Sequence, residues 1–525
     1  MAHLVIAPVL VPLLVAAVQL LVGARHRRTL ATLSLLSCLA LVVVATLLMV
    51  SVSDPSGAGS TAVYRVGNWP ASFAIVLVAD RLSALMVLLT AVLALAVLPG
   101  ALGRWQHMGV YFQPQFQLLL MGLNGAFLTG DLFNLFVFFE VLLAASYGLA
   151  LHGSGPRRVS ASLHYIAINL SASMLLLLGV SLIFGVTGTL NMAVLARLIP
   201  TLGEGARTLL HAGAALLGMA FLVKTAVWPL GFWLPRTYSA ATPPVAAMFA
   251  IMTKLGIYIL LRLSLLLFGA DAGAASAHFG SQWLLWGGIA TLAVGTVGML
   301  GARELSKLAG YNVLISSGTL LGAIALQQPL VTAGALAYLV ISTLAIAAFF
   351  LLAGLLVPHD EPEGIEQLEP YDPQGDALFT AEIERRVEIP APVALLGVCF
   401  LACAVLLAGL PPLSGFVAKF ALLAPMLGAG PGAMVLFALV IAAGLGTVIA
   451  MCRAGIQIFW GDADRVFPRV PVGETLSVLI LLALCVVLTV VVAAPWRYLS
   501  ATARQIHVAE HYIRAVSPQA AEVSP

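Results

Sequence analysis

The chain has few charged residues. Only 9% of its 525 residues are Asp, Glu, Lys or Arg, whereas 61% are hydrophobic, and its mean hydropathy is +1.05. A soluble domain needs a charged surface around its core, so this composition excludes a soluble globular protein and indicates an all-α, polytopic membrane protein. Stretches of about 20 apolar residues, long enough to cross a bilayer as helices, predict fourteen transmembrane spans. They lie near residues 3–22, 29–50, 73–98, 113–130, 132–151, 162–184, 209–231, 241–267, 281–301, 303–326, 330–357, 391–425, 432–458 and 473–494.

The sequence also lacks the patterns of common cofactor and metal sites. Its five cysteines all fall in predicted spans, without a CxxC pair or a histidine cluster beside them. This argues against iron–sulfur clusters, zinc and a disulfide framework. No glycine-rich nucleotide loop follows a strand pattern, and the net charge of +3 includes no basic run suited to nucleic acid. We therefore expect no metal, no nucleic acid and no direct use of ATP.

Lysine is the scarcest cation, with four residues against twenty-one arginines. Three of the four, Lys224, Lys254 and Lys419, lie inside predicted spans, as does Glu140. A charge near the middle of a bilayer costs roughly 2.5–3.5 kcal/mol, so such residues usually face a protein interior or a wet cavity and carry function. A buried lysine can lose its proton near neutral pH, whereas arginine stays charged. The four residues predict a proton relay.

The four predicted relay residues differ in their expected partners. Glu140 needs a cation to stay ionised, and Lys224 lies at a similar depth on another span, so we expect the two to pair. A static buried ion pair that only fixes packing is the alternative. Lys254 and Lys419 have no acidic residue at their depth. Burial without a partner favours the neutral form of a lysine, which suits the uptake and release of protons.

Two further charged residues have simpler predicted roles. Lys307 begins a span beside Arg303 and Glu304, which predicts an anchor at the membrane interface rather than a relay member. Asp131 comes directly before the fifth span and is predicted to cap its N-terminus.

Arginine positions predict the orientation in the membrane. Most loop arginines fall in the odd-numbered loops, so these loops are expected in the cytoplasm and both termini outside. The segment 358–388 differs because it holds ten of the twenty-two acidic residues. It is either a solvated cytoplasmic connector or a docking surface for a partner subunit.

Prolines predict two broken helices. Pro229 follows Lys224 in the seventh span, and Pro411 and Pro412 precede Lys419 in the twelfth. Proline breaks a transmembrane helix, and broken helices at matching places in two halves indicate inverted repeats, although unrelated kinks are an alternative. The predicted organisation is an N-terminal unit of spans 1–3 (1–112), repeat 1 of spans 4–8 (113–267), repeat 2 of spans 9–13 (281–458), and span 14 with the C-terminal tail (459–525).

Several motifs together resemble one family. They are GDLFNLFVFFEVLLAASYGL, KTAVWPLGFWLPRTYSAATPPVAAMFAIMTKLGIYILLR, ARELSKLAGYNVLISSGTL and GLPPLSGFVAKF. This set resembles the proton-translocating antiporter-like family, which is shared by respiratory complex I and the multisubunit Mrp (Mnh, Pha) monovalent cation/proton antiporters. The segment GNWPASFAIVLVADRLSALMVLL is similar to the D subunits of those antiporters.

The resemblance implies fourteen helices, two inverted five-helix repeats, broken helices 7 and 12, and no cofactor. The relay residues of the family fall on Glu140, Lys224, Lys254 and Lys419. Relatives often carry a histidine in span 11, where this chain has Ile341 and Ser342 and no ionisable group. A water molecule, Ser342 or Thr343 would then have to carry protons past this position in place of the histidine.

The expected function is that of a proton-translocating subunit of a multisubunit Na⁺(K⁺)/H⁺ antiporter in the bacterial cytoplasmic membrane, and not that of an enzyme. Its partners would be an A-like subunit and small membrane subunits, with the sodium or potassium ion bound mainly elsewhere. One alternative is a proton-pumping membrane subunit of complex I or of a membrane-bound hydrogenase. Another is a non-transporting scaffold, against which the costly buried charges argue.

Overall fold

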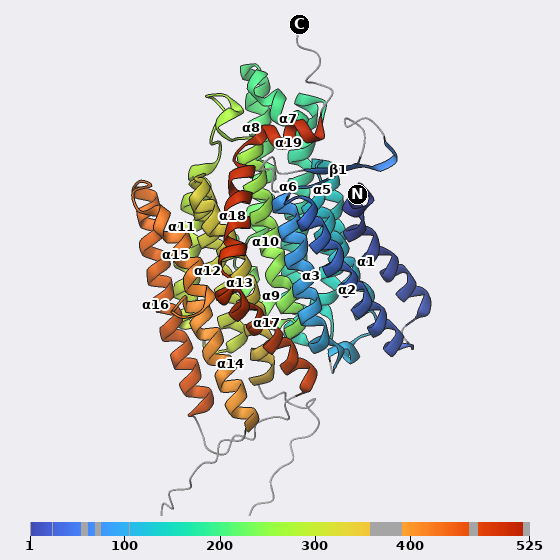
Figure 1. Ribbon diagram of the computed structural model, residues 1–525, viewed down its shortest axis with the longest axis vertical. Coiled ribbons are helices and arrows are strands. Elements are labelled where there is room, and N and C mark those ends of the chain that lie inside the picture. Colours follow the sequence, from blue (N-terminus) through green and yellow to red (C-terminus); the bar gives the residue numbers. More distant parts are fainter. Residues whose placement is uncertain are drawn as a thin grey trace, which may run out of the picture.

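A computed structural model describes residues 2–23, 25–53, 61–68, 75–103, 105–356, 391–460 and 471–517. It consists mainly of long helices that run side by side (Figure 1). The acidic segment 358–388 lies outside the described residues. The helices are α1 (Ala2–Val22), α2 (Arg27–Ser51), α3 (Arg81–Leu102), α4 (Phe112–Leu128), α5 (Leu132–Leu151), α6 (Pro156–Thr187), α7 (Met192–Leu198), α8 (Glu204–Lys224), α9 (Trp233–Ala240), α10 (Pro243–Leu266), α11 (Ser281–Gly301), α12 (Leu305–Ala325), α13 (Pro329–Leu356), α14 (Ala391–Ala408), α15 (Ser414–Leu423), α16 (Pro431–Phe459), α17 (Val472–Val490), α18 (Ala493–Ile506) and α19 (Ala509–Val516).

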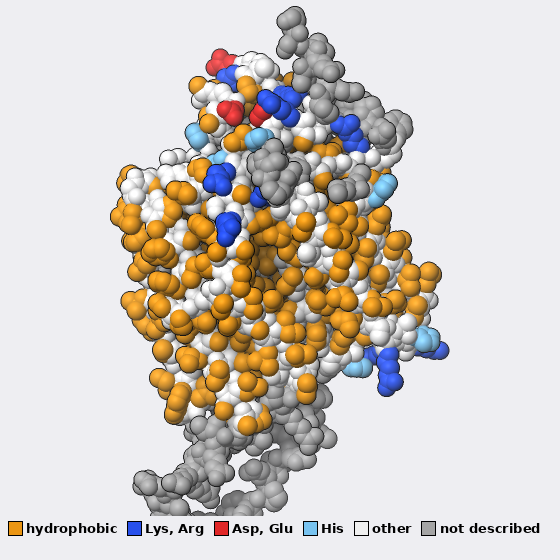
Figure 2. All heavy atoms as spheres, in the orientation of Figure 1, with side chains coloured by type: hydrophobic (Ala, Val, Ile, Leu, Met, Phe, Trp, Pro, Cys, Tyr) orange, Lys and Arg blue, Asp and Glu red, His pale blue; other side chains and the backbone are white. Residues whose placement is uncertain are grey.

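Thirteen helices of the described chain are long and apolar enough to cross a membrane. Helix α4, predicted as the fourth span, is shorter, with 17 residues. Hydrophobic side chains cover the broad middle of the molecule, and charged side chains gather towards its ends (Figure 2). An apolar belt between charged ends is what a lipid bilayer requires of an embedded protein. The predicted all-α, polytopic fold is confirmed.

The start of the third span was predicted wrongly. Residues near its expected beginning form strand β2 (Val76–Ala79), which pairs antiparallel with β1 (Ala62–Arg65). The helix α3 begins only at Arg81, because the Asp80 carboxylate accepts a hydrogen bond from the Ser83 N–H and caps it. The hairpin therefore lies at the end of the helical bundle rather than within the apolar span.

Both predicted breaks are present. Helix α8 ends at Lys224, and α9 begins at Trp233, with Pro229 between them. Helix α14 ends at Ala408, and α15 begins at Ser414 after the two prolines. Proline has no N–H to continue a helix and its ring clashes with the preceding turn, so each apolar stretch divides into two helices.

Three helices form the centre of the bundle. In their most apolar windows, 100% of the residues of α10 and 94% of those of α12 and α13 are buried inside the protein. Helix α10 packs against both of the others. A charged side chain on these helices is therefore shielded from both lipid and solvent. Lys254, on α10, is in this position.

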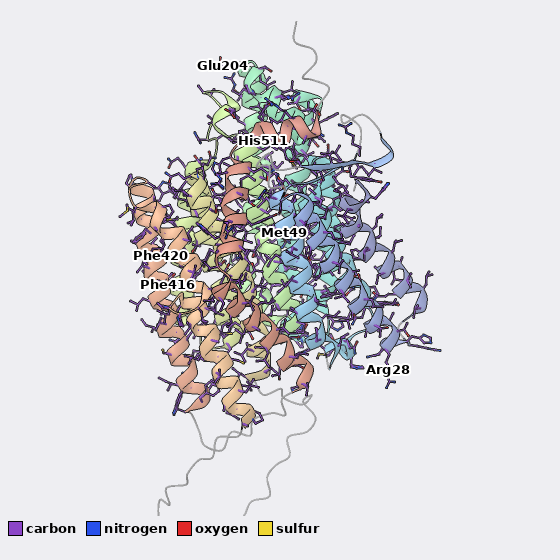
Figure 3. The ribbon with its side chains drawn as sticks, viewed as in Figure 1. Arg28, Met49, Glu204, Phe416, Phe420 and His511 are labelled. Atoms are coloured by element: carbon purple, nitrogen blue, oxygen red, sulfur yellow. The ribbon has the colours of Figure 1, made fainter. Side chains whose placement is uncertain are left out.

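The two termini of the described chain lie near one end of the molecule. Helix α1 begins, and α19 finishes, at the upper end in Figure 1. Arg28 lies at the opposite end from Glu204 and His511 (Figure 3). The C-terminal region, predicted only as a tail, forms α18, which packs along α13, and α19, which contacts α7 and β1.

Candidate functional site

The Asp131 cap fixes the start of the helix that carries Glu140. Its carboxylate accepts hydrogen bonds from the backbone N–H groups of Phe133 and Asn134. The predicted cap is thus confirmed, and Glu140 lies in the ninth position of α5. Its Oε1 accepts a hydrogen bond from the hydroxyl of Ser173 on α6.

Lys224 is the last residue of α8 and is 1% exposed. Its Nζ lies 3.5 Å from Asn169 Oδ1 on α6, to which it donates a hydrogen bond. The ammonium also lies 5.3 Å from the ring centre of Phe139 and 5.7 Å from that of Tyr165. Cation–π contacts of this kind partly replace the water that a buried ammonium loses.

Glu140 and Lys224 interact electrostatically, as expected, but their charged atoms do not come within 4.0 Å of each other in the described structure. Within the described ranges, the N–O contacts of 4.0 Å or less between opposite charges involve other residues. The physical reason is that α6 offers each of them a neutral partner: Ser173 for Glu140 and Asn169 for Lys224. The carboxylate still acts electrostatically on the ammonium.

Helix α6 is therefore a polar bridge that the sequence alone did not reveal. Asn169 and Ser173 are both fully buried and are four residues apart, so they share one face of the helix. Ser173 binds the carboxylate on α5, and Asn169 binds the ammonium on α8. The sequence feature that could have indicated this role is a pair of polar residues, four positions apart, within an apolar span. Taken alone, such a pair is weak evidence for a functional role.

Lys254 is fully buried on the central helix α10. Its Nζ donates a hydrogen bond of 2.6 Å to the hydroxyl of Ser316 on α12. Ser316 in turn donates a 3.0 Å hydrogen bond to the hydroxyl of Ser342 on α13. As expected, no acidic side chain is paired with Lys254 in the part of the chain that the structure describes.

Lys419 lies on α15, directly after the second break. Its Nζ donates hydrogen bonds to the carbonyls of Leu407 (3.0 Å) and Ala408 (2.7 Å), the last residues of α14. Carbonyls at a helix C-terminus lack intrahelical partners and carry partial negative charge, so they stabilise a cation without an acidic side chain. Gly409 makes room for this arrangement: it has φ +75°, and a Cβ there would lie 2.4 Å from Lys419 Cδ.

The four predicted residues thus belong to one run of packed helices but do not form one compact cluster. Glu140 and Lys224 meet through α6, while Lys254 lies among α10, α12 and α13, and Lys419 lies at the junction of α14 and α15. Helix α10 packs against α8, and α13 packs against α15, so the groups of neighbouring helices follow one another across the bundle. Lys307 stands apart as predicted, 42% exposed and paired with Glu304 at 2.8 Å.

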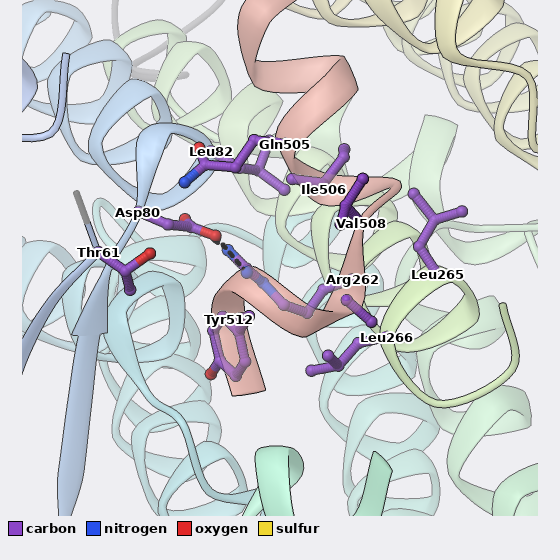
Figure 4. A pocket seen from close by; sticks show the side chains of 11 residues that line it. Thr61, Asp80, Leu82, Arg262, Leu265, Leu266, Gln505, Ile506, Val508 and Tyr512 are labelled. Atoms are coloured by element: carbon purple, nitrogen blue, oxygen red, sulfur yellow. Dashed lines mark hydrogen bonds and ion pairs between the residues drawn. The ribbon is translucent and has the colours of Figure 1, made fainter. Parts of the chain in front are cut away.

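A second buried charge cluster was missed by the sequence analysis. Arg262 on α10 binds both oxygens of Asp80, at 2.5 and 2.8 Å (Figure 4). Tyr512 of α19 lies over the guanidinium, with its ring centre 5.3 Å away. Burial alone would favour the protonated acid, but the charge and hydrogen bonds of Arg262 outweigh it and hold the pKa of Asp80 below its ordinary value of 3.8. The available signal was an arginine inside a predicted span.

This cluster holds α3, α10 and α19 together, which leads to a stability prediction. Replacing Asp80 with alanine leaves Arg262 buried and unpaired, so we expect the variant to lose about 3–5 kcal/mol of stability. Thermal unfolding in detergent, followed by intrinsic fluorescence, should show a clearly lowered Tm. Because the pKa of Asp80 is depressed, its contribution is complete above its unfolded-state pKa and is lost only as the pH falls through the lower folded-state value.

The matched control is Glu510→Ala, which breaks the exposed ion pair with Arg514 in the same region. An exposed pair contributes about 0–1 kcal/mol, so this variant should unfold close to the wild-type temperature. Equal Tm values for Asp80→Ala and the wild type would contradict a stabilising role for the Asp80–Arg262 pair.

Comparison with known proteins identifies the family. Residues 129–446 match the family model described as NADH:quinone oxidoreductase/Mrp antiporter, TM. The chain is 51% identical to a protein of Rhizobium meliloti named as the D subunit of a probable K⁺/H⁺ antiporter, over 95% of each chain. It is 33% identical to the D subunit of a Na⁺/H⁺ antiporter of Alkalihalophilus pseudofirmus, over 98% of this chain and 99% of that one.

Solved structures agree in fold. A chain of the Mrp complex from Dietzia sp. is 27% identical, with a TM-score of 0.82 over 98% of this chain and 100% of that chain. A chain of respiratory complex I from Thermus thermophilus, 23% identical, has a TM-score of 0.74 over 96% of this chain and 98% of that chain, which shows a shared fold. With a family model that covers more than half of its length and with relatives that match it nearly from end to end, the chain belongs to the NADH:quinone oxidoreductase/Mrp antiporter transmembrane family.

Proposed function

We propose that this chain is the proton-carrying membrane subunit of a multisubunit antiporter that exchanges Na⁺ or K⁺ for H⁺. The observation that carries the proposal is the set of three buried lysines, each hydrogen-bonded to a neutral group on a neighbouring helix. A lysine that donates to a neutral acceptor keeps this hydrogen bond whether its own side chain is protonated or neutral. A fixed ion pair would instead lock the proton in place.

The proton path proposed here runs through Glu140, Lys224, Lys254 and Lys419 in that order along the bundle. Glu140 and Lys224 act together because the α6 side chains link them and their charges interact. Movement of a proton onto or off either group changes the field at the other, which provides coupling between successive steps. The two broken helices, α8–α9 and α14–α15, support a further proposal: 113–267 and 281–458 are inverted repeats, each with its own broken helix.

The same fold serves redox-driven complexes, so a proton-pumping subunit of such a complex is the second candidate. The specific observation in its favour is the structural similarity to complex I, and at 23% identity that similarity concerns the fold alone. The relatives named as antiporter D subunits match at higher identity over nearly the whole chain, which favours the antiporter. The expected location is the bacterial cytoplasmic membrane, with both termini outside.

The partners of the proposed antiporter are expected to supply the oxygen ligands of the transported cation. The three buried relay charges of this chain, Lys224, Lys254 and Lys419, are cationic and would repel a sodium or potassium ion, which needs several oxygen ligands. Among the described residues, no group of three or more His, Cys, Asp and Glu side chains could hold a metal ion. We propose that the cation site lies mainly in a companion subunit, with an A-like subunit and small membrane subunits as partners.

Reconstitution tests this division of labour. Liposomes that contain the full set of membrane subunits and an internal pH-sensitive dye should show proton movement when Na⁺ or K⁺ is added outside. Liposomes with this chain alone should show none above the signal of empty liposomes. Robust exchange by the chain alone would overturn the need for partners, and no exchange by the complete set with either cation would overturn the antiporter function.

A further inference from the structure

In the described structure, the route between Lys254 and Lys419 has no acidic or basic side chain in its middle, but it has two serine hydroxyls and lies beside the phenol of Tyr338. Lys254 Nζ donates to Ser316 Oγ at 2.6 Å, and Ser316 Oγ donates to Ser342 Oγ at 3.0 Å. All three groups are buried. A hydroxyl can accept one hydrogen bond while it donates another, so a pair of them forms a directed chain from α10 through α12 to α13.

The Ser342 hydroxyl donates to the carbonyl of Leu339 on its own helix at 3.3 Å, and Ser342 also lines a small cavity. The walls of this cavity include Asn312, Tyr338 and Leu407, with about 10 Å³ open to the centre of a water molecule. That space is about what one water needs, and a buried water is stable where two to four polar groups surround it. The remaining walls are mainly isoleucine and leucine residues, so the polar groups of the cavity are few.

Lys419 is hydrogen-bonded to a residue of the cavity wall rather than lining the cavity itself. Its Nζ donates to the carbonyl of Leu407, one of the lining residues, and to that of Ala408. An ammonium has three N–H bonds, and these two carbonyls take two of them. The third N–H, or the lone pair after deprotonation, is left for a water in the cavity.

From this arrangement we propose that Ser316, Ser342 and a water in the cavity carry protons between Lys254 and Lys419. The inference rests on the proposed function and adds the residues that connect two of its lysines. Lys254 gives its proton to Ser316 as Ser316 passes its own to Ser342, Ser342 passes its own to the water, and the water passes one to neutral Lys419. Each hydroxyl gains and loses one proton, so only the two lysines change charge. Rotation of the hydroxyls then restores the starting directions.

The chain provides matched controls on the same two helices. Ser317 follows Ser316 on α12, and its buried hydroxyl has no hydrogen-bond partner in the described structure. Thr343 follows Ser342 on α13, and its hydroxyl donates to the carbonyl of Leu339 on its own helix at 2.6 Å. Both neighbours are as deep in the bundle as the proposed bridge, yet neither belongs to it.

The experiment measures Na⁺- or K⁺-driven proton movement by the complete complex in everted vesicles. Ser316→Ala and Ser342→Ala should each slow exchange about tenfold or more, since each change removes a hydroxyl that the transfer needs and leaves a buried polar group without its partner. Ser342→Cys, which keeps the volume but bonds hydrogen weakly, should be slowed as well, whereas Ser342→Thr should keep most of the rate. Ser317→Ala and Thr343→Ala should stay near the wild-type rate.

Two readouts separate a proton-carrying role from a packing role. In D₂O, Ser342→Ala should show a larger slowing relative to H₂O than the wild type, because proton transfer across the bridge becomes limiting. An unchanged isotope ratio, or equal losses in Ser342→Thr and Ser342→Ala with normal assembly, would overturn the bridge. Lys254→Ala serves as the reference: if it is inactive while both serine variants keep the wild-type rate, the bridge is wrong and the proposed function stands. If Lys254→Ala keeps the wild-type rate, the proposed function itself fails.

Discussion

Lys224→Ala is expected to abolish cation-dependent proton movement in everted vesicles while the complex still assembles. The Lys224 ammonium is buried, is held by Asn169 and two aromatic rings, and interacts electrostatically with Glu140. Removing it takes away the proton-accepting group that the proposed path places next to Glu140, so transfer stops. Glu140→Ala should be equally inactive, because it removes the other member of the same couple.

The control for this experiment is Lys307→Ala. That lysine is exposed and paired with Glu304, so its loss should leave exchange close to the wild-type rate. The amount of assembled complex is measured in parallel by immunoblotting of membranes after purification of a tagged partner subunit. Normal exchange in an assembled Lys224→Ala or Glu140→Ala complex would remove that residue from the proton path.

Lys419→Arg is expected to fail almost as badly as Lys419→Ala. Arginine keeps the positive charge beside the carbonyls of α14 but cannot release its proton near neutral pH. If position 419 only supplied a fixed cation to the helix terminus, the arginine variant would work. Initial rates of dye response over a range of Na⁺ and K⁺ concentrations distinguish the two cases, and a wild-type rate in Lys419→Arg would show that the residue acts as a fixed charge.

The burial of the three relay lysines could be predicted from the sequence, because the bilayer restricts where charged side chains occur. A lysine in the middle of an apolar stretch must be buried in protein, and Lys224, Lys254 and Lys419 are. The two helix breaks followed from proline chemistry in the same direct way. These features are local, so neighbouring residues along the chain were enough to predict them.

The partners of these residues could not be predicted, because they depend on how distant helices pack. Ser173 is 33 positions from Glu140, and Ser316 is 62 positions from Lys254. Matching depth predicted that Glu140 and Lys224 interact, but it could not predict which side chains of α6 bind each of them. The Asp80–Arg262 pair was missed because its members are 182 positions apart, and nothing local in the sequence indicates that they meet.

The most direct test of the account is the rate of cation-driven proton movement by an assembled complex that carries Lys254→Ala. Lys254 lies on the central helix, between the Glu140–Lys224 couple and the serine bridge to Lys419, so every proton on the proposed path must pass it. The account predicts that addition of Na⁺ or K⁺ to everted vesicles with this variant produces no dye response above that of vesicles lacking the complex. A wild-type response from fully assembled Lys254→Ala complex would contradict it.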